Sequence, residues 1–227
     1  NNSQGSVKLV LDAQFADTII IALPANTPNT SKIVITPSDA NGIEITPAET
    51  VDPLRALSTV TLNGFSSDEA DSIGDVPDEA LETVLTIAYG ALAAESVGGS
   101  QRCLDMTLDY TEQRVQFDRP IASFQAVKHR CADMFINLEA SRSAAYGAAN
   151  TTDTKERLEA YLIAKAYASE AYFTIAGDAI QMHGGIGFTW EYPLHYFFKR
   201  ARANKSLFHS VEDSYDRLAT LISEGAS

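Results

Sequence analysis

The residue types with the most potential for chemistry lie in one segment, Gln181 to Ala203, which reads QMHGGIGFTWEYPLHYFFKRARA. Gly184 and Gly185 follow a long apolar helical pattern, an aromatic loop comes next, and a basic segment begins after Pro193. Glycine just past a helix end is the usual C-cap, because only glycine enters the left-handed region without a steric penalty. A backbone without side chains also lets a ligand approach closely. The pattern therefore fits a plain helix stop or a cofactor-facing corner.

Other reactive side chains do not form a recognisable site. The sequence contains no GxSxG, P-loop or CxxC motif, and the glycines at 184–187 end a helix instead of opening one after a strand, as a dinucleotide-binding motif would. Cys103 and Cys131 are isolated, which is typical of small buried hydrophobes in a reducing compartment. The histidines share no metal-ligand spacing; they are His129, His183, His195 and His209. Spacing alone predicts no metal site and no reaction.

Composition limits the classes of partner. The chain has 227 residues, of which 45% are hydrophobic and 21% charged, as in an ordinary globular protein. Its net charge of −13 disfavours nucleic acid and anionic membrane surfaces. No apolar run approaches the roughly 20 residues that span a bilayer. We therefore expect a cytoplasmic protein that binds neither nucleic acid nor membrane.

The first part of the chain, residues 1–75, reads as a partial β-domain. Asn41-Gly42 suits a hairpin turn between the third and fourth strands, because both residues tolerate positive φ. The acidic segment 66–75 is predicted to be a link. The strands are short, β-branched and bounded by turn residues, and we expect them at 7–11, 18–22, 32–35, 43–45 and 60–62.

The second part, residues 76–227, reads as a helical bundle. Three long patterns of apolar residues at intervals of three and four begin at Pro77, Pro120 and Asp153, and two shorter helices are expected after Pro193 and Ser210. Antiparallel helices of about 30 residues joined by short links make a four-helix bundle. Gly98 and Gly99 interrupt the first pattern; they mark either a weak point in the helix or a close contact with another helix.

Three segments together resemble the acyl-CoA dehydrogenase family. Arg114–Ile121, reading RVQFDRPI and followed by Phe124-Gln125, is similar to the family's RxxFGxPI and FQ stretch. Gln181–Phe188, reading QMHGGIGF and followed by Glu191-Tyr192-Pro193, resembles its QxxGGxG(F/Y) stretch, and Gly5–Asp17 resembles its middle β-domain. The resemblance covers nearly the whole chain. The segment HGGIGFTWE is most similar to subunits of heteromeric actinobacterial steroid-CoA dehydrogenases.

The resemblance implies the fold and the chemistry. The family has an N-terminal helical domain, a β-domain and a C-terminal four-helix bundle. The expected fold class is therefore α+β, a partial antiparallel β-domain followed by a four-helix bundle, with the N-terminal helical domain absent from the sequence. Family members dehydrogenate an acyl-CoA between Cα and Cβ. A Glu removes the α proton while FAD accepts a hydride from Cβ.

The resemblance also assigns FAD-binding positions, in the half of the site that one subunit lends to its neighbour. Arg114 matches the residue that pairs with the pyrophosphate through charge-assisted bonds, although a surface salt bridge is an alternative role for it. The other matching positions are Phe117, Phe124 and Gln125 near the adenosine end, and Gln181, Gly184 and Gly185 near the diphosphate and ribose.

The positions that would serve the chain's own flavin and substrate depart from the family pattern. Leu9–Leu11 aligns with a Trp-Ile-Thr segment that packs on the isoalloxazine, so a stacking ring and a hydroxyl donor are missing. The family's catalytic Glu has two known positions, which correspond here to Phe208 and Ala88, and the adjoining substrate Arg falls on Tyr89. Neither alanine nor phenylalanine accepts a proton. We therefore expect no catalytic residue in this chain.

Three other carboxylates keep a relocated base open as an alternative. Glu95 is roughly two turns beyond Ala88, about 10 Å away and too far to reach the same reacting atom. Glu212 would need a shift of a few residues in the alignment. Glu191 belongs to the segment after the glycines, where we expect it to shape the turn.

The sequence thus leads to one principal hypothesis and two alternatives. The principal one is a subunit of an α2β2 acyl-CoA dehydrogenase, with a catalytic partner subunit, an acyl-CoA substrate such as a steroid side-chain CoA, and an electron-transferring flavoprotein as electron acceptor. The alternatives are a homotetrameric dehydrogenase with a relocated base and a non-catalytic scaffold or CoA-binding subunit.

Overall fold

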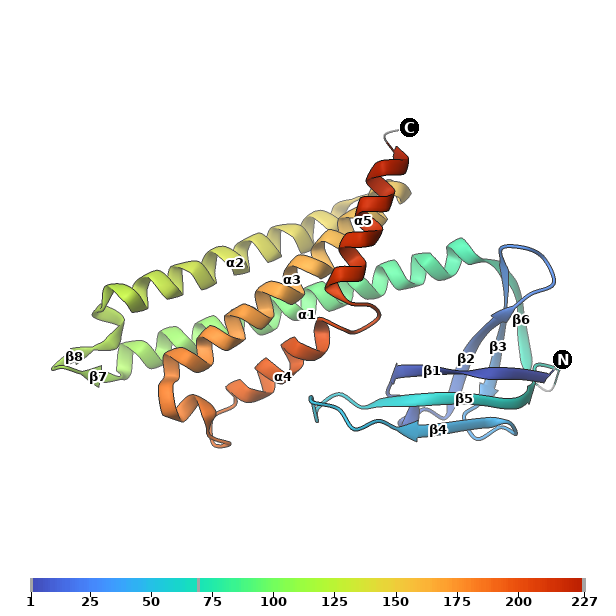
Figure 1. Ribbon diagram of the computed structural model, residues 1–227, viewed down its shortest axis with the longest axis horizontal. Coiled ribbons are helices and arrows are strands. Elements are labelled where there is room, and N and C mark those ends of the chain that lie inside the picture. The colour runs from blue at the N-terminus through green and yellow to red at the C-terminus, as the bar shows by residue number, and fades with distance from the viewer. Residues whose placement is uncertain (1, 69, 226–227) are drawn as a thin grey trace. The chain divides into compact units, whose positions relative to one another are not determined.

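The computed structural model describes residues 2–68 and 70–225 (Figure 1). The chain divides into two compact units, residues 1–84 and residues 85–227. The first unit is built of strands and the second of helices. The predicted α+β fold class, with antiparallel strands followed by a helical bundle, is confirmed.

The described part of the first unit contains two three-stranded antiparallel sheets. Their orders are β1-β5-β4 and β2-β3-β6. A small core of Leu23, Val34 and Phe65 joins them. The strands are β1 (Asn2–Leu11), β2 (Thr18–Pro24), β3 (Thr30–Pro37), β4 (Ile43–Pro47), β5 (Leu57–Ser66) and β6 (Asp71–Pro77), with a short 3-10 turn at Ala13–Phe15.

Two sequence interpretations in this unit were wrong. The segment 66–75, predicted as a link, contains most of β6, which pairs with β3 at the edge of its sheet. An edge strand with exposed side chains tolerates an acidic sequence, so the usual apolar alternation is absent. The turn at Asn41-Gly42 does not close a hairpin, because β3 and β4 belong to different sheets. Gly42 does take a positive φ of 82°.

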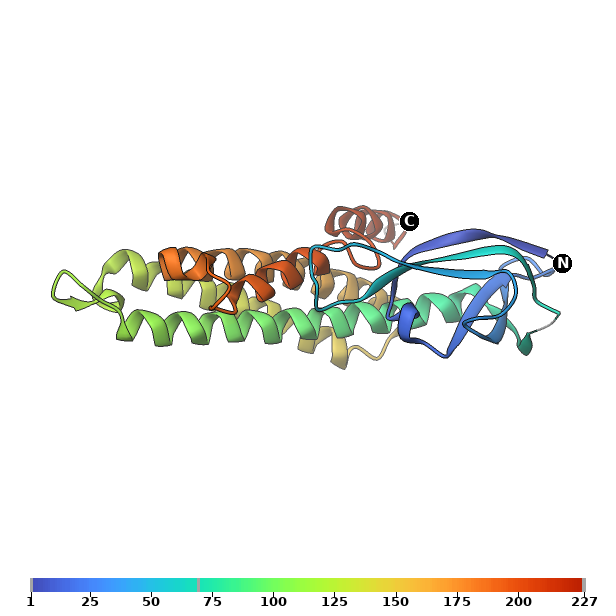
Figure 2. The ribbon, with the colours of Figure 1, turned by 90° about the horizontal axis from the view of Figure 1, so that it is seen from below.

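The second unit is a bundle in which α1, α2 and α3 run antiparallel in turn (Figure 1). α1, α2 and α3 lie side by side in both views (Figures 1 and 2), and α4 contributes to the same core. The helices are α1 (Asp78–Gln113), α2 (Gln125–Asn150), α3 (Thr154–His183), α4 (Leu194–Asn204) and α5 (Val211–Gly225). The connecting elements are β7 (Val115–Gln116), β8 (Arg119–Pro120), η2 (Ile121–Ser123) and η3 (Gly184–Phe188).

Local signals explain where the helices start. Asp78 and Glu79 occupy the first turn of α1, where negative charge is favourable beside the helix dipole. The Asp153 carboxylate accepts a hydrogen bond from the Glu156 backbone N–H (3.1 Å), as the Asp-led cap predicted. The Asp213 N–H donates to Ser210 Oγ and the Asp213 carboxylate accepts from the Ser210 N–H, each at 3.0 Å, a reciprocal capping box at α5.

The two adjacent glycines of α1 do not break the helix. A Cβ added to Gly99 would lie 2.3 Å from the Tyr172 ring of α3, whereas a Cβ on Gly98 would meet nothing within 4 Å. A second glycine, Gly90, faces Tyr161 of α3 in the same way. The close-contact interpretation therefore holds for Gly99, since two α3 tyrosines pack where α1 has no side chain.

The most apolar helix among the described residues is α1. By length and composition alone it could cross a membrane, with a mean hydropathy of 1.2 over an 18-residue window of which 28% is buried. The expectation that no run approaches spanning length was therefore too strict, because leucine, isoleucine, valine and alanine keep the mean hydropathy high although glycine, threonine and serine interrupt the apolar run. The buried side of α1 contributes to the bundle core, as in many helices of globular proteins.

Candidate functional site

The hairpin between α1 and α2 presents an aromatic side chain to the surroundings. Phe117 and Asp118 form its two-residue turn with φ of 54° and 61°, the left-handed geometry of a type I′ turn. Asp118 stands where the related family pattern has glycine. Phe117 is 86% exposed and meets the half-buried Phe124 ring edge to face at 6.1 Å. Left-handed backbone is unfavourable for phenylalanine and is typically retained where it serves a function.

Arg114 stands at the base of this hairpin. Its backbone N–H donates to the Tyr110 carbonyl (2.9 Å) and its carbonyl accepts from the Ile121 N–H (2.8 Å), so the backbone is fixed while the side chain is exposed. Within residues 2–68 and 70–225 the Arg114 guanidinium makes no ion pair or hydrogen bond, so the salt-bridge alternative finds no partner there. Gln125, the first residue of α2, is also exposed. The structure thus brings Arg114, Phe117, Phe124 and Gln125 into one segment.

The glycine corner, residues 184–188, follows directly after α3. Gly184 has a φ of 59° and ends the helix, as the C-cap pattern predicted. A Cβ on Gly187 would lie 2.6 Å from the Ile180 carbonyl oxygen, because the chain folds back on the last turn of α3. Gly185 has neither requirement: its φ is not positive, and an added Cβ would meet nothing within 4 Å. The fold therefore explains two of these glycines and leaves the Gly185 backbone open to an approaching ligand.

A buried histidine ties the glycine corner to α1. His183 is 2% exposed, and its ring stacks on Tyr110 with centroids 4.3 Å apart. His183 Nδ1 lies 2.7 Å from the Ala179 carbonyl oxygen, and Nε2 lies 3.0 Å from Tyr192 Oη. Burial lowers the pKa of His183, so the neutral ring donates from Nδ1 and accepts the Tyr192 hydroxyl at Nε2.

These contacts place the predicted FAD-binding residues at one end of the bundle. Figure 1 shows β7 and β8 at the same end as the last turn of α3. Gln181 is exposed on that last turn. Two aromatic side chains of the following loop, Phe188 and Trp190, are 78% and 74% exposed, and Lys199 lies over the Trp190 ring at 4.6 Å. Large exposed aromatic side chains at one end of a molecule commonly mark a binding surface.

One of the two positions where the related family carries its base is occupied by an aromatic side chain, Phe208, which is 43% exposed. Phe208, with a φ of 66°, lies edge to face with the buried Tyr89 at 6.3 Å, and His209 meets Tyr89 at 4.6 Å. We call Tyr89, Phe208 and His209 the aromatic plug. Ala88, the other base position, is the neighbour of Tyr89 on α1. Neither position offers a carboxylate.

A buried lysine holds the plug in place. Lys165 of α3 is fully buried, and its Nζ donates a hydrogen bond to the His209 carbonyl. Burial lowers the pKa of Lys165 to about 8, against the attraction of Asp213 and Glu212. Burial, together with the positive charges of Lys165 and Arg217, also lowers the pKa of His209 to about 4. His209 is therefore neutral at neutral pH, whereas Lys165 still carries its charge there.

One of the three alternative carboxylates is engaged in contacts between helices. The other two are exposed and are not part of the aromatic plug. Glu95 accepts hydrogen bonds from Arg200 at 2.7 Å and from Asn204 at 3.1 Å, an arrangement that ties α1 to α4. Glu212 is exposed in the first turn of α5, and Glu191 is exposed in the loop after the glycine corner. A carboxylate engaged by a guanidinium is a poor proton acceptor, because the nearby positive charge favours the ionised form.

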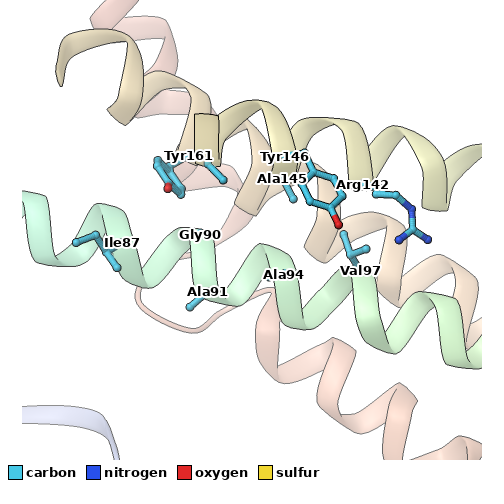
Figure 3. Close-up of a pocket in the computed structure, with 10 residues that line it drawn as sticks. Ile87, Gly90, Ala91, Ala94, Val97, Arg142, Ala145, Tyr146 and Tyr161 are labelled. Atoms are coloured by element: carbon cyan, nitrogen blue, oxygen red, sulfur yellow. The ribbon is translucent and has the colours of Figure 1, made fainter. Parts of the chain in front are cut away.

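A groove of about 460 Å³ lies between α1 and α2 (Figure 3). Arg142 stands at one end, where its guanidinium bonds Gln101 Oε1 (2.6 Å) and Glu139 (3.0 Å). The other lining residues are small, apolar or aromatic: Ile87, Gly90, Ala91, Ala94, Val97, Ala145, Tyr146, Ala149 and Tyr161. The groove contains no acid–base pair and adds no candidate for catalysis.

Sequence reasoning did not find two of these features. The contact of His183 with Tyr110 joins residues of different helices, and neither residue type carries a motif of its own. Lys165 lies among alanines in an apolar helical pattern, where a lysine would ordinarily be placed at the surface. The aspartate at position 118 did show in the sequence as a departure from the family pattern.

Comparison with known protein families agrees with this geometry. The family description "Acyl-CoA dehydrogenase, C-terminal domain" matches residues 79–207, a range that includes all the positions predicted to bind FAD. The matched range contains the hairpin, the glycine corner and the helices of the bundle core. The chain belongs to the acyl-CoA dehydrogenase family, whose members are FAD-dependent oxidoreductases.

Individual relatives and solved structures extend the similarity. The chain is 38% identical over 178 residues to "Acyl-CoA dehydrogenase IpdE2" of Mycobacterium tuberculosis, covering 78% of this chain and 52% of the relative. It is similar to a variant of the "Tcur3481-Tcur3483 steroid ACAD" (TM-score 0.85, 30% identity, 99% of this chain and 60% of that one). It is also similar to the "ChsE4-ChsE5 complex" of M. tuberculosis (TM-score 0.87, 26% identity, 97% and 59%). The chain thus spans about half the length of the first curated relative.

Proposed function

We propose that this chain is the non-catalytic subunit of a heteromeric α2β2 acyl-CoA dehydrogenase in the cytoplasm. It completes the FAD site of a partner subunit that carries the catalytic Glu. The observation that carries the proposal is the contrast within the helical unit. The two base positions are Ala88 and Phe208, which cannot accept a proton, while Arg114, Phe117 and Gly185 are exposed and available to a ligand.

The exposed residues suit FAD in type and in availability. An arginine with no partner among the described residues offers charge-assisted hydrogen bonds to a diphosphate. The open backbone at Gly185 allows a phosphate or ribose to approach where a side chain would obstruct it. Gln181 adds an amide at this surface. Phe117 and Phe124, together with Gln125, offer an aromatic and polar edge to the adenosine end.

The division of labour follows from these residues. FAD, when bound, accepts a hydride from Cβ of the acyl-CoA. This chain would bind and orient the diphosphate end through Arg114 and the glycine corner. At the positions where a proton would otherwise be removed, Ala88 and Phe208 offer no proton-accepting group. Removal of the α proton is therefore assigned to the partner subunit.

The relatives support the partner and the substrate class. The structures it resembles include one described as a steroid ACAD and one described as a complex of two proteins, ChsE4 and ChsE5. By this similarity we assign a bulky substrate such as a steroid side-chain CoA, and an electron-transferring flavoprotein as the acceptor that reoxidises the flavin.

A test of the proposal compares the chain alone with the chain co-produced with candidate catalytic partners. We expect the chain alone to show no flavin absorbance and no acyl-CoA dehydrogenation. With the right partner, both should appear in one co-purifying complex. Flavin and turnover in the chain alone would contradict the proposal and favour a homotetramer with a relocated base. A stable complex that never carries flavin would favour the scaffold alternative.

A further inference from the structure

The feature that joins the two parts of the predicted FAD-binding surface is the stack of His183 on Tyr110. The rings are 4.3 Å apart and tilted by 23°. The Tyr110 carbonyl accepts the Arg114 N–H, so Tyr110 stands one helical turn before the arginine. His183 is directly followed by Gly184. The stack therefore links the backbone that carries Arg114 to the backbone of the glycine corner.

Two further contacts fix the orientation of the imidazole. Nδ1 lies 2.7 Å from the Ala179 carbonyl oxygen, within the same helix. Nε2 accepts the hydroxyl of Tyr192, whose ring also lies 4.7 Å from the imidazole and 6.5 Å from Tyr110. With both nitrogens bonded and one face covered, the ring of His183 has a single orientation. The loop beyond the glycine corner is held by the same contact.

We propose that Tyr110, His183 and Tyr192 form a positioning unit that sets the spacing between Arg114 and Gly185 for the FAD diphosphate. The proposal rests on the function proposed above. The three residues act through Arg114 and the glycine backbone, without touching the cofactor. A surface built from two separate helices binds an extended ligand well only when its parts are already in place, since ordering them on binding costs affinity.

Another contact near this end of the bundle is more exposed to solvent and therefore weaker. The Arg130–Asp178 ion pair joins α2 to α3 at 2.9 Å, but the Arg130 side chain is 53% exposed. Exposed ion pairs contribute little, because water screens them and two long side chains must be ordered. The stack centres on the buried His183 ring, which has two hydrogen bonds and is shielded from solvent. The spacing of the FAD-binding surface is therefore assigned to the positioning unit, and Arg130 serves as the control.

The test uses the flavin-bearing complex of this chain with its catalytic partner. FAD is first removed from the complex and then titrated back while flavin absorbance and fluorescence are followed. Tyr110→Leu removes the stack and should weaken FAD binding roughly tenfold, the scale of one aromatic pair. Tyr110→Phe keeps the ring and should bind like the wild type. Tyr192→Phe removes one hydroxyl and should weaken FAD roughly fivefold. Arg130→Ala should change FAD affinity by less than about twofold.

Arg114→Ala separates failure of this inference from failure of the proposed function. If Arg114→Ala releases FAD while Tyr110→Leu and Tyr192→Phe bind it as the wild type does, the positioning unit is wrong and the FAD-binding surface stands. If none of the variants, including Arg114→Ala, changes FAD affinity, the proposed surface fails and the inference with it. Should Tyr110→Leu not fold, Tyr192→Phe decides, because wild-type affinity in that variant overturns the inference.

Discussion

The two ends of the predicted dehydrogenase site are built in opposite ways in this chain. At the hairpin and glycine corner, Arg114 and Phe117 are exposed although the backbone beneath them is fixed by hydrogen bonds. At the base positions, the buried Tyr89 packs against Phe208 and His209, and Lys165 is fully buried beneath them. One region thus exposes side chains that suit a ligand, whereas the other has no proton-accepting group at Ala88 or Phe208.

The region of the base positions should show the largest energetic effect, in the pH dependence of stability. The pKa of Lys165 is lowered to about 8 in the folded chain, so the unfolded chain binds more protons between about pH 8 and pH 10.5. The free energy of unfolding should therefore rise through that window, by up to about 3 kcal/mol for a shift of this size. Urea unfolding of the wild type and of Lys165→Met across this range measures the effect, and the variant should lack the rise. Equal pH dependence in both proteins would contradict a buried amine.

The open region should respond most to loss of Arg114. In the flavin-bearing complex, Arg114→Ala should weaken FAD binding about 10- to 100-fold, because charge-assisted hydrogen bonds contribute about 1.5–3 kcal/mol. Arg114→Lys keeps the charge but loses the bidentate geometry, so an intermediate affinity is expected. Flavin titration of the stripped complex provides the measurement. Unchanged affinity in both variants would remove Arg114 from the site.

The two glycines of the corner should separate folding from binding. Gly184 needs left-handed backbone, so Gly184→Ala should lower the free energy of unfolding by about 1 kcal/mol. Gly185 has no such need, and Gly185→Ala should leave stability within about 0.5 kcal/mol while weakening FAD binding. Urea unfolding and flavin titration of both variants check this. Loss of stability without loss of affinity in Gly185→Ala would make it a structural glycine.

The smallest effect on turnover is expected at Glu95. Its contacts with Arg200 and Asn204 tie α1 to α4, so Glu95→Gln should lower stability by about 1 kcal/mol or less. The kcat of the complex should stay within about twofold of the wild type. A fall of about 100-fold or more would identify Glu95 as a general base and erase the contrast between the two regions.

The sequence predicted those parts of the fold and site that depend on local pattern. The Asp153 cap of α3 and the helix stop at Gly184 follow from residues adjacent in the chain and are confirmed. The first helix begins at Asp78, one residue after the predicted Pro77, and the second begins at Gln125, five residues after the predicted Pro120. The edge strand β6 was missed, because an acidic strand paired on one side lacks an apolar alternation.

Features that depend on the meeting of separate segments were beyond sequence reasoning. Of the two turn residues expected to take positive φ, Gly42 does and Asn41 does not, and nothing local says that the turn leads into a different sheet. The stack of His183 on Tyr110 and the burial of Lys165 arise only when α1, α3 and the loop before α5 come together. The assignment of Arg114 and Gly185 to FAD stays a prediction, supported by their exposure.

The central claim, that this chain completes a flavin site without having its own, is tested most directly by the flavin content of the purified complex. Leu9–Leu11 offers no aromatic ring for an isoalloxazine, and Ala88 and Phe208 supply no base. We therefore expect one FAD for each pair of one catalytic chain and one chain of this kind, measured by flavin absorbance after denaturation against quantified protein. One FAD for every chain in the complex would contradict the claim.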